Sequence, residues 1–307
     1  MILGIDAGGT KTKVVVMDNN GDILHIGKGG PGNHLNVGIE GVLDVISKAL
    51  GKFKDNKFDI AILALAGVGF DPEIRKYFAD TMKKVIKSKN IEVYNDCYVA
   101  LKGAIGKRKT GMLILSGTGS MVIGVDEEGK HHKVGGWGHL LGDEGSGYKI
   151  SYDAIRAVMG YWEGIGPDTI LKDAVFEYFG FKDYMDVIKF FYMGDIQRDK
   201  IASFSPYVIR CAEDKDFVAI QIIKNNIKKL LSGIGSVKLQ IEDDYISYGG
   251  GMFNSIYYKE MVEEELKIMG FKLHKPILSP IGGALFMGFE ALKILNHNIF
   301  ENLKSIA

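Results

Sequence analysis

The chain has 307 residues and a formal net charge of zero at pH 7, because 38 Lys and Arg balance 38 Asp and Glu. No cluster of basic residues stands out, so we expect neither a nucleic-acid nor a membrane-surface partner. The longest apolar run, residues 60–70, is shorter than the roughly 20 residues of a membrane-spanning helix, and we expect a soluble cytoplasmic protein of about two domains. The two cysteines, Cys97 and Cys211, form no Cys-x-x-Cys pair, which suits a reducing compartment and thiols buried in the core.

The first turn of the chain has the composition of a phosphate-binding loop. Residues 2–5 are mostly apolar and residues 14–16 are β-branched, and the short polar segment between these runs predicts a hairpin. In this segment, Asp6-Ala7-Gly8-Gly9-Thr10-Lys11-Thr12, the glycines let a ligand approach the backbone, the threonines add hydroxyls and the lysine adds a cation. Its spacing is not that of a P-loop, and it leads into a strand where a dinucleotide-binding turn leads into a helix. Taken alone, the turn could equally be a structural connector.

The residues that follow predict the element order β-β-β-α-β-α-β. The periodicity and the turn residues favour strands at 23–26, 58–67 and 91–96, and helices at 37–50, at 73–87 and after 96. The loop at 29–34 presents Asn33, which could face a ligand or only support the turn. The strand at 91–96 ends in Asn95-Asp96, which places Asp96 at the start of a helix.

The plan of residues 3–22 is repeated at residues 112–130. Both stretches contain an apolar strand, a small polar turn, a β-branched strand and an acidic turn closed by glycine. The second small turn is Ser116-Gly117-Thr118-Gly119-Ser120. An ordered repeat of this kind indicates a duplicated unit. We expect the two hydroxyl-rich turns to face each other across a cleft and to grip a polyphosphate from both sides.

Two further glycine-rich segments are candidate ligand loops. Residues 135–147 hold Trp137 and two acids among glycines, which favours a ligand loop over a linker. Later in the chain, a strand at 244–248 ends in Gly249-Gly250-Gly251. Glycines allow a flat ring to lie against the backbone, so we take this turn as the candidate adenine side.

The remaining segments are predominantly helical. Residues from about 168 to 240 are amphipathic, Asn254 or Ser255 can cap a helix at 257–269, and a last helix covers 282–295. We therefore place an N-terminal domain at residues 1–110, joined by a C-terminal helix at about 290–307. The second domain is placed at 111–289, with a helical insertion at about 160–240.

These motifs, in this order, resemble the actin-like sugar kinase and heat-shock ATPase superfamily. The resemblance rests on Asp-x-Gly-Gly-Thr-Lys-Thr, on Ser-Gly-Thr-Gly-Ser and on the late strand ending in Gly-Gly-Gly. Gly-Asn-His at 32–34, Asn95-Asp96 and the Trp-containing segment at 135–146 are similar to the N-acetylglucosamine kinase branch, also described as the BadF/BadG/BcrA/BcrD ATPase family. The resemblance runs from Leu3 to about Leu292. It implies an α/β fold with two actin-like (ribonuclease H-like) domains around a cleft and a helical insertion in the second.

The resemblance also implies roles for individual residues. Asp96 would be the base that takes a proton from the sugar hydroxyl, although a helix N-cap is the alternative role for this side chain. Asp6 would hold Mg²⁺, which prefers one or two carboxylates together with phosphate oxygens. The residues implied for ATP are Gly8, Gly9, Thr10, Lys11, Thr12, Gly117, Thr118 and Gly119 for the phosphates, and Gly250 and Gly251 for adenosine. Those implied for the sugar, besides Asp96, are Asn33, Gly136, Trp137 and Asp143.

We therefore expect an ATP-dependent kinase that acts on a hexose or amino sugar, with N-acetylglucosamine as the first acceptor to test. Two alternatives remain at this point. The first is an ATPase that activates a 2-hydroxyacyl-CoA dehydratase or a benzoyl-CoA reductase, which needs thiolates for an iron–sulfur cluster at a dimer face. The second is a nucleotide-binding module without chemistry. A homodimer is the default expectation for a symmetric soluble enzyme.

Overall fold

The computed structural model describes residues 1–193 and 198–306. These residues form two compact units: the first contains residues 1–109 and 275–307, and the second contains residues 110–274. Among the described residues, no helix is both long and apolar enough to cross a membrane.

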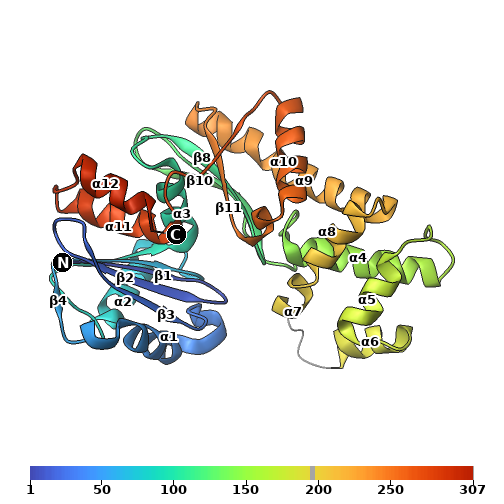
Figure 1. The fold of residues 1–307 in the computed structure, drawn as a ribbon, viewed down its shortest axis with the longest axis horizontal. Coiled ribbons are helices and arrows are strands. Elements are labelled where there is room, and N and C mark those ends of the chain that lie inside the picture. Colours follow the sequence, from blue (N-terminus) through green and yellow to red (C-terminus); the bar gives the residue numbers. More distant parts are fainter. Residues whose placement is uncertain (194–197, 307) are drawn as a thin grey trace. The chain divides into compact units, whose positions relative to one another are not determined.

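The first unit is built on a five-stranded mixed sheet with the order β3-β2-β1-β5-β7. Figure 1 labels its first three strands, β1, β2 and β3. Its strands are β1 (Ile2–Ala7), β2 (Thr12–Met17), β3 (Ile23–Gly29), β5 (Ile60–Leu65) and β7 (Ile91–Asn95). The first three strands are antiparallel, whereas β1, β5 and β7 run parallel. Ala7 pairs with Thr12, so the predicted hairpin and its glycine-rich turn are confirmed.

Helices cover both faces of this sheet because its central strands are apolar on both sides. Leu3 and Ile5 of β1 pack with the helices α1 (His34–Leu50) and α2 (Pro72–Met82), whereas Ile2 faces the opposite cluster. That opposite cluster is formed by α3 (Asp96–Ile105), α11 (Pro280–Ala291) and α12 (His297–Lys304) (Figure 1). Short elements complete the unit: η1 (Gly51–Phe53), β4 (Lys57–Phe58) and β6 (Lys87–Ser88). Two elements differ from the prediction. The helix expected at 73–87 ends at Met82. The strand expected at 58–67 is divided at Asp59 into β4 and β5.

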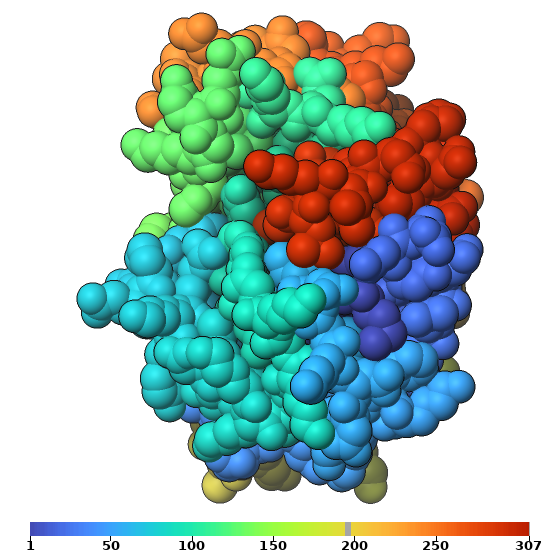
Figure 2. All heavy atoms as spheres, turned by 90° about the vertical axis from the view of Figure 1, so that its left-hand side faces the viewer, coloured from blue at the N-terminus to red at the C-terminus, as the bar shows by residue number. Residues whose placement is uncertain are grey.

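The segment 275–289 belongs to the first unit, whereas the sequence predicts it in the second domain. Figure 2 shows the C-terminal segment, in red, directly against the blue N-terminal residues. Two backbone hydrogen bonds, from Ile277 N to Ala104 O and from Leu278 N to Gly103 O, attach it to α3. A Cβ atom on Gly283 would lie 2.5 Å from Val99 O and 2.9 Å from Gly103 Cα, so α11 and α3 meet backbone to backbone. Only glycine allows this approach.

The second unit repeats the sheet of the first. Its strands are β8 (Gly111–Ser116), β9 (Ser120–Val125), β10 (His131–Gly135), β11 (Ile246–Gly249) and β12 (Leu273–His274). The order β10-β9-β8-β11-β12 matches that of the first sheet, with β8, β9 and β10 antiparallel and β8, β11 and β12 parallel. The predicted duplication is therefore confirmed. The strands β10 and β12 had no clear sequence signal, because β10 is polar and β12 has two residues.

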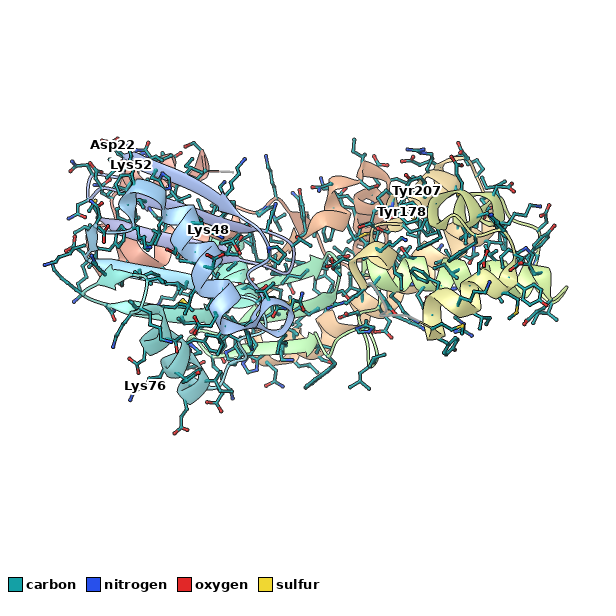
Figure 3. The ribbon with its side chains drawn as sticks, turned by 90° about the horizontal axis from the view of Figure 1, so that it is seen from below. Asp22, Lys48, Lys52, Lys76, Tyr178 and Tyr207 are labelled. Carbon is teal, nitrogen blue, oxygen red and sulfur yellow. The ribbon has the colours of Figure 1, made fainter. Side chains whose placement is uncertain are left out.

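Most of the second unit outside the sheet is helical. The helices are α4 (Gly147–Trp162), α5 (Leu171–Phe179), α6 (Tyr184–Tyr192), α7 (Arg198–Ala202), α8 (Ser205–Glu213), α9 (Phe217–Ile241), η2 (Gly251–Asn254) and α10 (Ile256–Ile268). The ring of Tyr178 on α5 packs against the ring of Tyr207 on α8, with their centroids 4.9 Å apart and their planes tilted (Figure 3). Of the two candidate caps for α10, Ser255 accepts the hydrogen bond from Tyr258 N.

Candidate active site

The carboxyl ends of the parallel strands bring two acidic side chains to one edge of the first sheet. Asp6 is the last but one residue of β1, and Asp96 follows directly after the end of β7. The strand β5 lies between them, with Ala64 opposite Asp6 and Leu65 opposite Asn95. Parallel sheets bind ligands at this edge, beyond the carboxyl ends of their strands.

Both carboxyl groups have a raised pKa. Burial is the largest cause for Asp6, the negative charge of Asp96 is the next, and together they raise the pKa of Asp6 to about 6 against the opposing effect of Lys11 and Lys13. Burial also raises the pKa of Asp96, while hydrogen bonds from the Cys97 thiol and backbone oppose that rise. Two neighbouring, partly buried carboxylates repel each other when both are ionised, and a cation bound between them would offset that repulsion.

The residues here fit Mg²⁺ as a partner of a bound phosphate. Among the residues that the structure describes, no group of three or more His, Cys, Asp or Glu side chains could hold a metal ion by itself. Mg²⁺ needs no such cage, since it is commonly held by one or two carboxylates, waters and the phosphates of the substrate. The repulsion between Asp6 and Asp96 is an electrostatic feature that a bound cation would relieve.

This electrostatic arrangement predicts an effect on stability that is independent of activity. Because the folded-state pKa of Asp6 is raised from 3.8 to about 6, its ionisation destabilises the folded protein fully above about pH 6 and not at all below about pH 4. Asp6→Asn should therefore raise Tm in metal-free buffer at pH 8, and this gain should disappear as the pH falls to 4. The exposed Asp44→Asn serves as the control in the same thermal unfolding series. A Tm difference for Asp6→Asn that is constant over this pH range would contradict the assignment.

Asp96 is not the residue that caps its helix. The N-cap of α3 is Asn95, whose Oδ1 accepts a hydrogen bond of 3.0 Å from Cys97 N. The Asn95 amide also donates to Val68 O at 2.8 Å, which ties this helix start to the loop after β5. Asp96 is then the first helical residue, where the helix dipole favours a negative charge. The helix-capping role is therefore filled by Asn95.

The turn between β1 and β2 leaves its backbone open. Gly8 N donates to Lys11 O at 2.9 Å, which closes the turn. Neither Gly8 nor Gly9 has a positive φ, and a Cβ on Gly9 would meet no atom within 4 Å. The chain's own conformation therefore does not require glycine at position 9, whereas close approach of a ligand to the backbone would. Thr10 and Lys11 are exposed beside it.

Thr12 stabilises this turn from the buried side. Its side chain is buried, with 1% exposure, and its hydroxyl donates to Gly30 O at 2.9 Å. The expected phosphate contact of Thr12 therefore does not fit its position. A Cβ on Gly32 would lie 2.6 Å from Thr12 Oγ1, so the loop that carries Asn33 packs closely on the same residue. Thr12 fixes the two loops to each other.

Asn33 has the supporting role that the sequence left open. Its Oδ1 caps α1 by accepting a hydrogen bond of 3.0 Å from Leu35 N. The loop after β5 packs against the same oxygen, since a Cβ on Gly67 would lie 2.5 Å from it. For the Asn33 amide nitrogen, the structure records no hydrogen-bond partner among the residues it describes. This nitrogen is the atom of Asn33 that could donate to a ligand.

The corresponding turn of the second unit, Ser116 to Ser120, is held by the segment 143–147. Ser116 Oγ donates to Gly145 O at 2.7 Å, Ser120 Oγ donates to Glu144 O at 2.7 Å, and Gly147 N donates to Gly117 O at 2.8 Å. The fully buried Tyr258 hydroxyl also lies 2.7 Å from Gly145 O. The turn is thus anchored through its two serines, while Gly117, Thr118 and Gly119 are half-buried.

The glycines after β11 lie against this turn. Gly250 has φ +98°, and a Cβ on it would lie 2.2 Å from Ser116 O. Both its backbone conformation and the lack of space therefore require glycine at this position. A Cβ on Gly117 would lie 3.6 Å from Gly251 N, which shows how close the two loops are. Gly251 itself is exposed, and a Cβ there would meet no atom within 4 Å. The structure therefore brings together the residues expected to bind phosphate and adenosine in this unit.

Asp143, which the resemblance implies as a sugar contact, is buried in the structure. Its residue exposure is 3%, Oδ1 accepts from Ser120 N at 3.2 Å, and Oδ2 accepts from Arg198 Nη2 at 2.9 Å. Burial raises the pKa of Asp143, while these two partners and His139 lower it. Arg198 had no sequence signal, because it lies among helices 55 residues from its partner.

The segment 135–147 thus has two parts with different environments. The part from 143 to 147 supports the turn, whereas Trp137 is 66% exposed, with Lys133 Nζ 4.0 Å from the centroid of its ring. Gly136 takes φ +69° and its N donates to Ser120 O at 3.1 Å, so the Trp-containing part begins directly beside the turn. Trp137 is therefore free of the core and could stack on a ligand.

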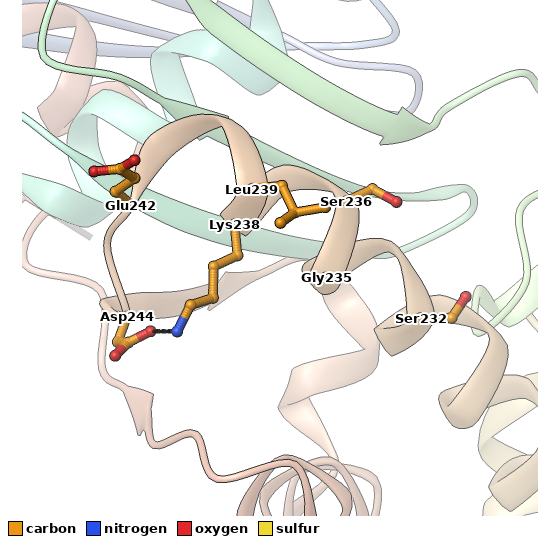
Figure 4. A pocket seen from close by; sticks show the side chains of 7 residues that line it. All are labelled: Ser232, Gly235, Ser236, Lys238, Leu239, Glu242 and Asp244. Carbon is orange, nitrogen blue, oxygen red and sulfur yellow. Dashed lines mark hydrogen bonds and ion pairs between the residues drawn. The ribbon is translucent and has the colours of Figure 1, made fainter.

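A hollow of about 780 Å³ lies at the end of the second sheet that is opposite the turn Ser116 to Ser120 (Figure 4). It is lined by the outer face of α9 and the residues after it, where Lys238 forms an ion pair with Asp244. Asp243, between the lining residues Glu242 and Asp244, accepts a hydrogen bond from the hydroxyl of Thr110, which precedes β8. The turn Ser116 to Ser120 follows the other end of β8. This hollow is therefore separate from the candidate site.

The repeated sheets and paired small turns define the actin-like class of α/β proteins. A solved structure, described as a putative N-acetylglucosamine kinase from Chromobacterium violaceum, shares this fold with a TM-score of 0.77 at 21% identity, over 93% of this chain and 98% of that one. Residues 3–288 match the family model of the BadF/BadG/BcrA/BcrD ATPase family, and the chain belongs to that family.

Two curated relatives have similar lengths to this chain. One is an N-acetylmuramic acid/N-acetylglucosamine kinase of Clostridium acetobutylicum, 30% identical over 266 residues that span 84% of this chain and 87% of that protein. The other is an N-acetyl-D-glucosamine kinase of Dictyostelium discoideum, 30% identical over 251 residues that span 77% of this chain and 79% of that protein.

Proposed function

We propose that this protein is an ATP-dependent sugar kinase that transfers the γ-phosphoryl group of Mg-ATP to an amino sugar, with N-acetylglucosamine as the proposed acceptor. The observation that carries the proposal is the position of Asp96. Its carboxylate begins α3 at the ligand-binding edge of the first sheet, beside Asp6 and with a raised pKa. The two curated relatives, both named as kinases of N-acetylated sugars, support the choice of acceptor.

Asp96 is the proposed base. A carboxylate with a raised pKa binds a proton more readily than an ordinary Asp, which suits it to accept the proton of the sugar hydroxyl as that oxygen attacks phosphorus. The hydrogen bonds from Cys97 N and from the Cys97 thiol to Asp96 Oδ1 hold the carboxylate in place. Most of the remaining rate enhancement would come from positioning and charge stabilisation, as in phosphoryl transfer generally.

The proposed nucleotide contacts come from both turns. Gly8, Gly9, Thr10 and Lys11 of the first turn and Gly117, Thr118 and Gly119 of the second would bind the phosphates, and Gly250 and Gly251 would lie against adenosine. Asp6 would hold Mg²⁺, which when bound neutralises charge on the phosphate oxygens. The open backbone at Gly9 and Gly251 supports these assignments, because neither position needs glycine for the chain's own packing. Thr12 is proposed as a support of the first turn only.

On the sugar side, the proposed contacts are Asn33 through its amide nitrogen, Gly136 through its backbone, and Trp137 through its exposed ring. An aromatic face suits the apolar side of a sugar, and Lys133 beside the ring adds a donor. Asp143 would act on the sugar only if Arg198 released it, so we propose it primarily as a support of the second turn. The homodimer remains a prediction that light scattering can test.

The thiols do not favour the dehydratase-activator alternative. Cys211 is 6% exposed and lies in the hydrophobic core of the second unit, whereas a cluster bound at a dimer face needs thiolates at the surface. Cys97 lies in the first unit and its thiol donates to Asp96.

A panel of acceptors tests the proposed function. We expect Mg-ATP-dependent ADP release that requires a sugar, with the highest kcat/KM for N-acetylglucosamine or N-acetylmuramic acid among glucose, glucosamine, N-acetylmannosamine and these two. The coupled assay would reject the proposal if ADP release were the same with and without every sugar in the panel.

A further inference from the structure

Arg198 connects the helical insertion to the turn at Ser116 to Ser120. It is the first residue of α7 and donates from Nη2 to Asp143 Oδ2 at 2.9 Å. The two side chains differ in environment, since that of Asp143 is 2% exposed and that of Arg198 is 39% exposed. Asp143 is therefore buried behind the turn, and the partly exposed Arg198 of the helical insertion contacts it there.

Asp143 carries two energetic costs that its surroundings offset. A buried carboxylate is unfavourable unless it is paired and hydrogen-bonded. Asp143 also has φ 66°, a left-handed backbone conformation that costs free energy in a residue other than glycine. Such costs persist where the surrounding contacts compensate them, and here those contacts are Arg198 and the Ser120 N–H. The pair is therefore built into the support of this turn.

The ion pair also fills the space behind Gly119. A Cβ on Gly119 would lie 2.8 Å from Arg198 Nη2 and 3.0 Å from Asp143 Oδ2. The Arg198 Nε is buried and has no hydrogen-bond partner among the described residues. The guanidinium and carboxylate groups therefore pack directly against the backbone of Gly119.

We propose that Arg198 is a positioning residue for nucleotide binding. Through Asp143 it fixes the backbone of Gly117, Thr118 and Gly119 in the shape that receives the ATP phosphates, and so makes ATP affinity depend on the seating of α7. This inference rests on the phosphate-binding role proposed above for the turn. It assigns to the helical insertion a function in nucleotide affinity.

Loss of Arg198 has a specific chemical consequence. The groups that act on Asp143 are Arg198, His139, Glu144 and the Ser120 N–H. Without the guanidinium, burial would act on the carboxyl group with less opposition, so Asp143 would take up a proton at a higher pH. A protonated carboxyl group accepts a weaker hydrogen bond from Ser120 N than a carboxylate does. ATP affinity should then fall with falling pH in a way that wild type does not show.

The test measures the Kd of Mg-ATP by calorimetry for the full chain at pH 6 and pH 8. The variants are Arg198→Met, Arg198→Lys, Asp143→Asn with Arg198→Met, and Arg210→Met, an exposed arginine of α8 that serves as the matched control. We expect Arg198→Met to raise Kd at pH 6 about tenfold, as the loss of one charged hydrogen bond can do, and to recover partly at pH 8. Arg198→Lys should restore most of the affinity, and the double variant should lose the difference between the two pH values.

Equal Kd values for Arg198→Met and Arg210→Met at both pH values would overturn the inference. It would also be overturned if Arg198→Met weakened binding equally at both pH values, lowered Tm and was not rescued by lysine, since that pattern describes a structural role only. The proposed kinase activity fails separately: wild type would then bind ATP without any sugar-dependent turnover, and the Kd series would still decide the role of Arg198.

Discussion

Asp96→Asn is expected to lower kcat for sugar phosphorylation by about 10²–10⁴-fold, the contribution of a positioned base. Asparagine has nearly the same shape but cannot accept the proton of the sugar hydroxyl. Because Asn95 caps α3, the helix should remain intact and Tm should not fall. The KM for ATP should change little, since Asp96 is not among the residues proposed to contact the nucleotide.

The matched control is Asp71→Asn. Asp71 caps α2, the helix that follows the neighbouring strand β5, and asparagine is as good a cap as aspartate. This variant should keep wild-type kcat and stability. If Asp96→Asn retained more than half of wild-type kcat in the same assay, Asp96 would not be the base, whatever the acceptor.

The second large effect concerns the neighbouring glycines 250 and 251, which should respond differently to alanine. Gly250→Ala places a Cβ 2.2 Å from Ser116 O at φ +98°, so both the turn and the protein should be destabilised, with a loss of about 1–3 kcal/mol or more. Gly251→Ala meets no atom within 4 Å in the chain itself. Its stability should therefore stay within about 0.5 kcal/mol of wild type.

ATP affinity separates the two glycines further. If adenosine lies against Gly251, the added methyl group of Gly251→Ala should raise the KM for ATP severalfold in a protein of normal stability. Urea unfolding and ATP titration of the two variants check both parts. A Gly251→Ala variant with unchanged stability and unchanged KM for ATP would remove this glycine from the proposed adenosine site.

The local patterns of the sequence predicted the elements that build the site. The alternation of apolar and glycine-rich segments located the β1–β2 hairpin, and its repetition located β8 and β9 with the same kind of turn. The position of Asp96 at the end of a parallel strand followed from the same pattern. These features depend on residues that are close in the chain, and hydrophobic periodicity and turn residues can be recognised in such short stretches of sequence.

The features that the sequence did not predict depend on contacts between distant residues. The place of α11 in the first unit follows from backbone contact between Gly283 and Gly103, and no local pattern identifies such a pair. Likewise, Asp143 resembles an exposed ligand in a glycine-rich segment until Arg198 is seen beside it. Thr12 looks like one more hydroxyl of the turn, and only the approach of Gly30 shows that this hydroxyl is buried.

The fate of the γ-phosphate of ATP tests the proposed phosphoryl transfer to a sugar most directly. Phosphorus NMR of a reaction with Mg-ATP and N-acetylglucosamine should show a sugar phosphate ester that grows in equal amount with ADP. The same reaction with Asp96→Asn should show almost none. Growth of inorganic phosphate in place of the ester, with or without sugar, would identify an ATPase and contradict the account.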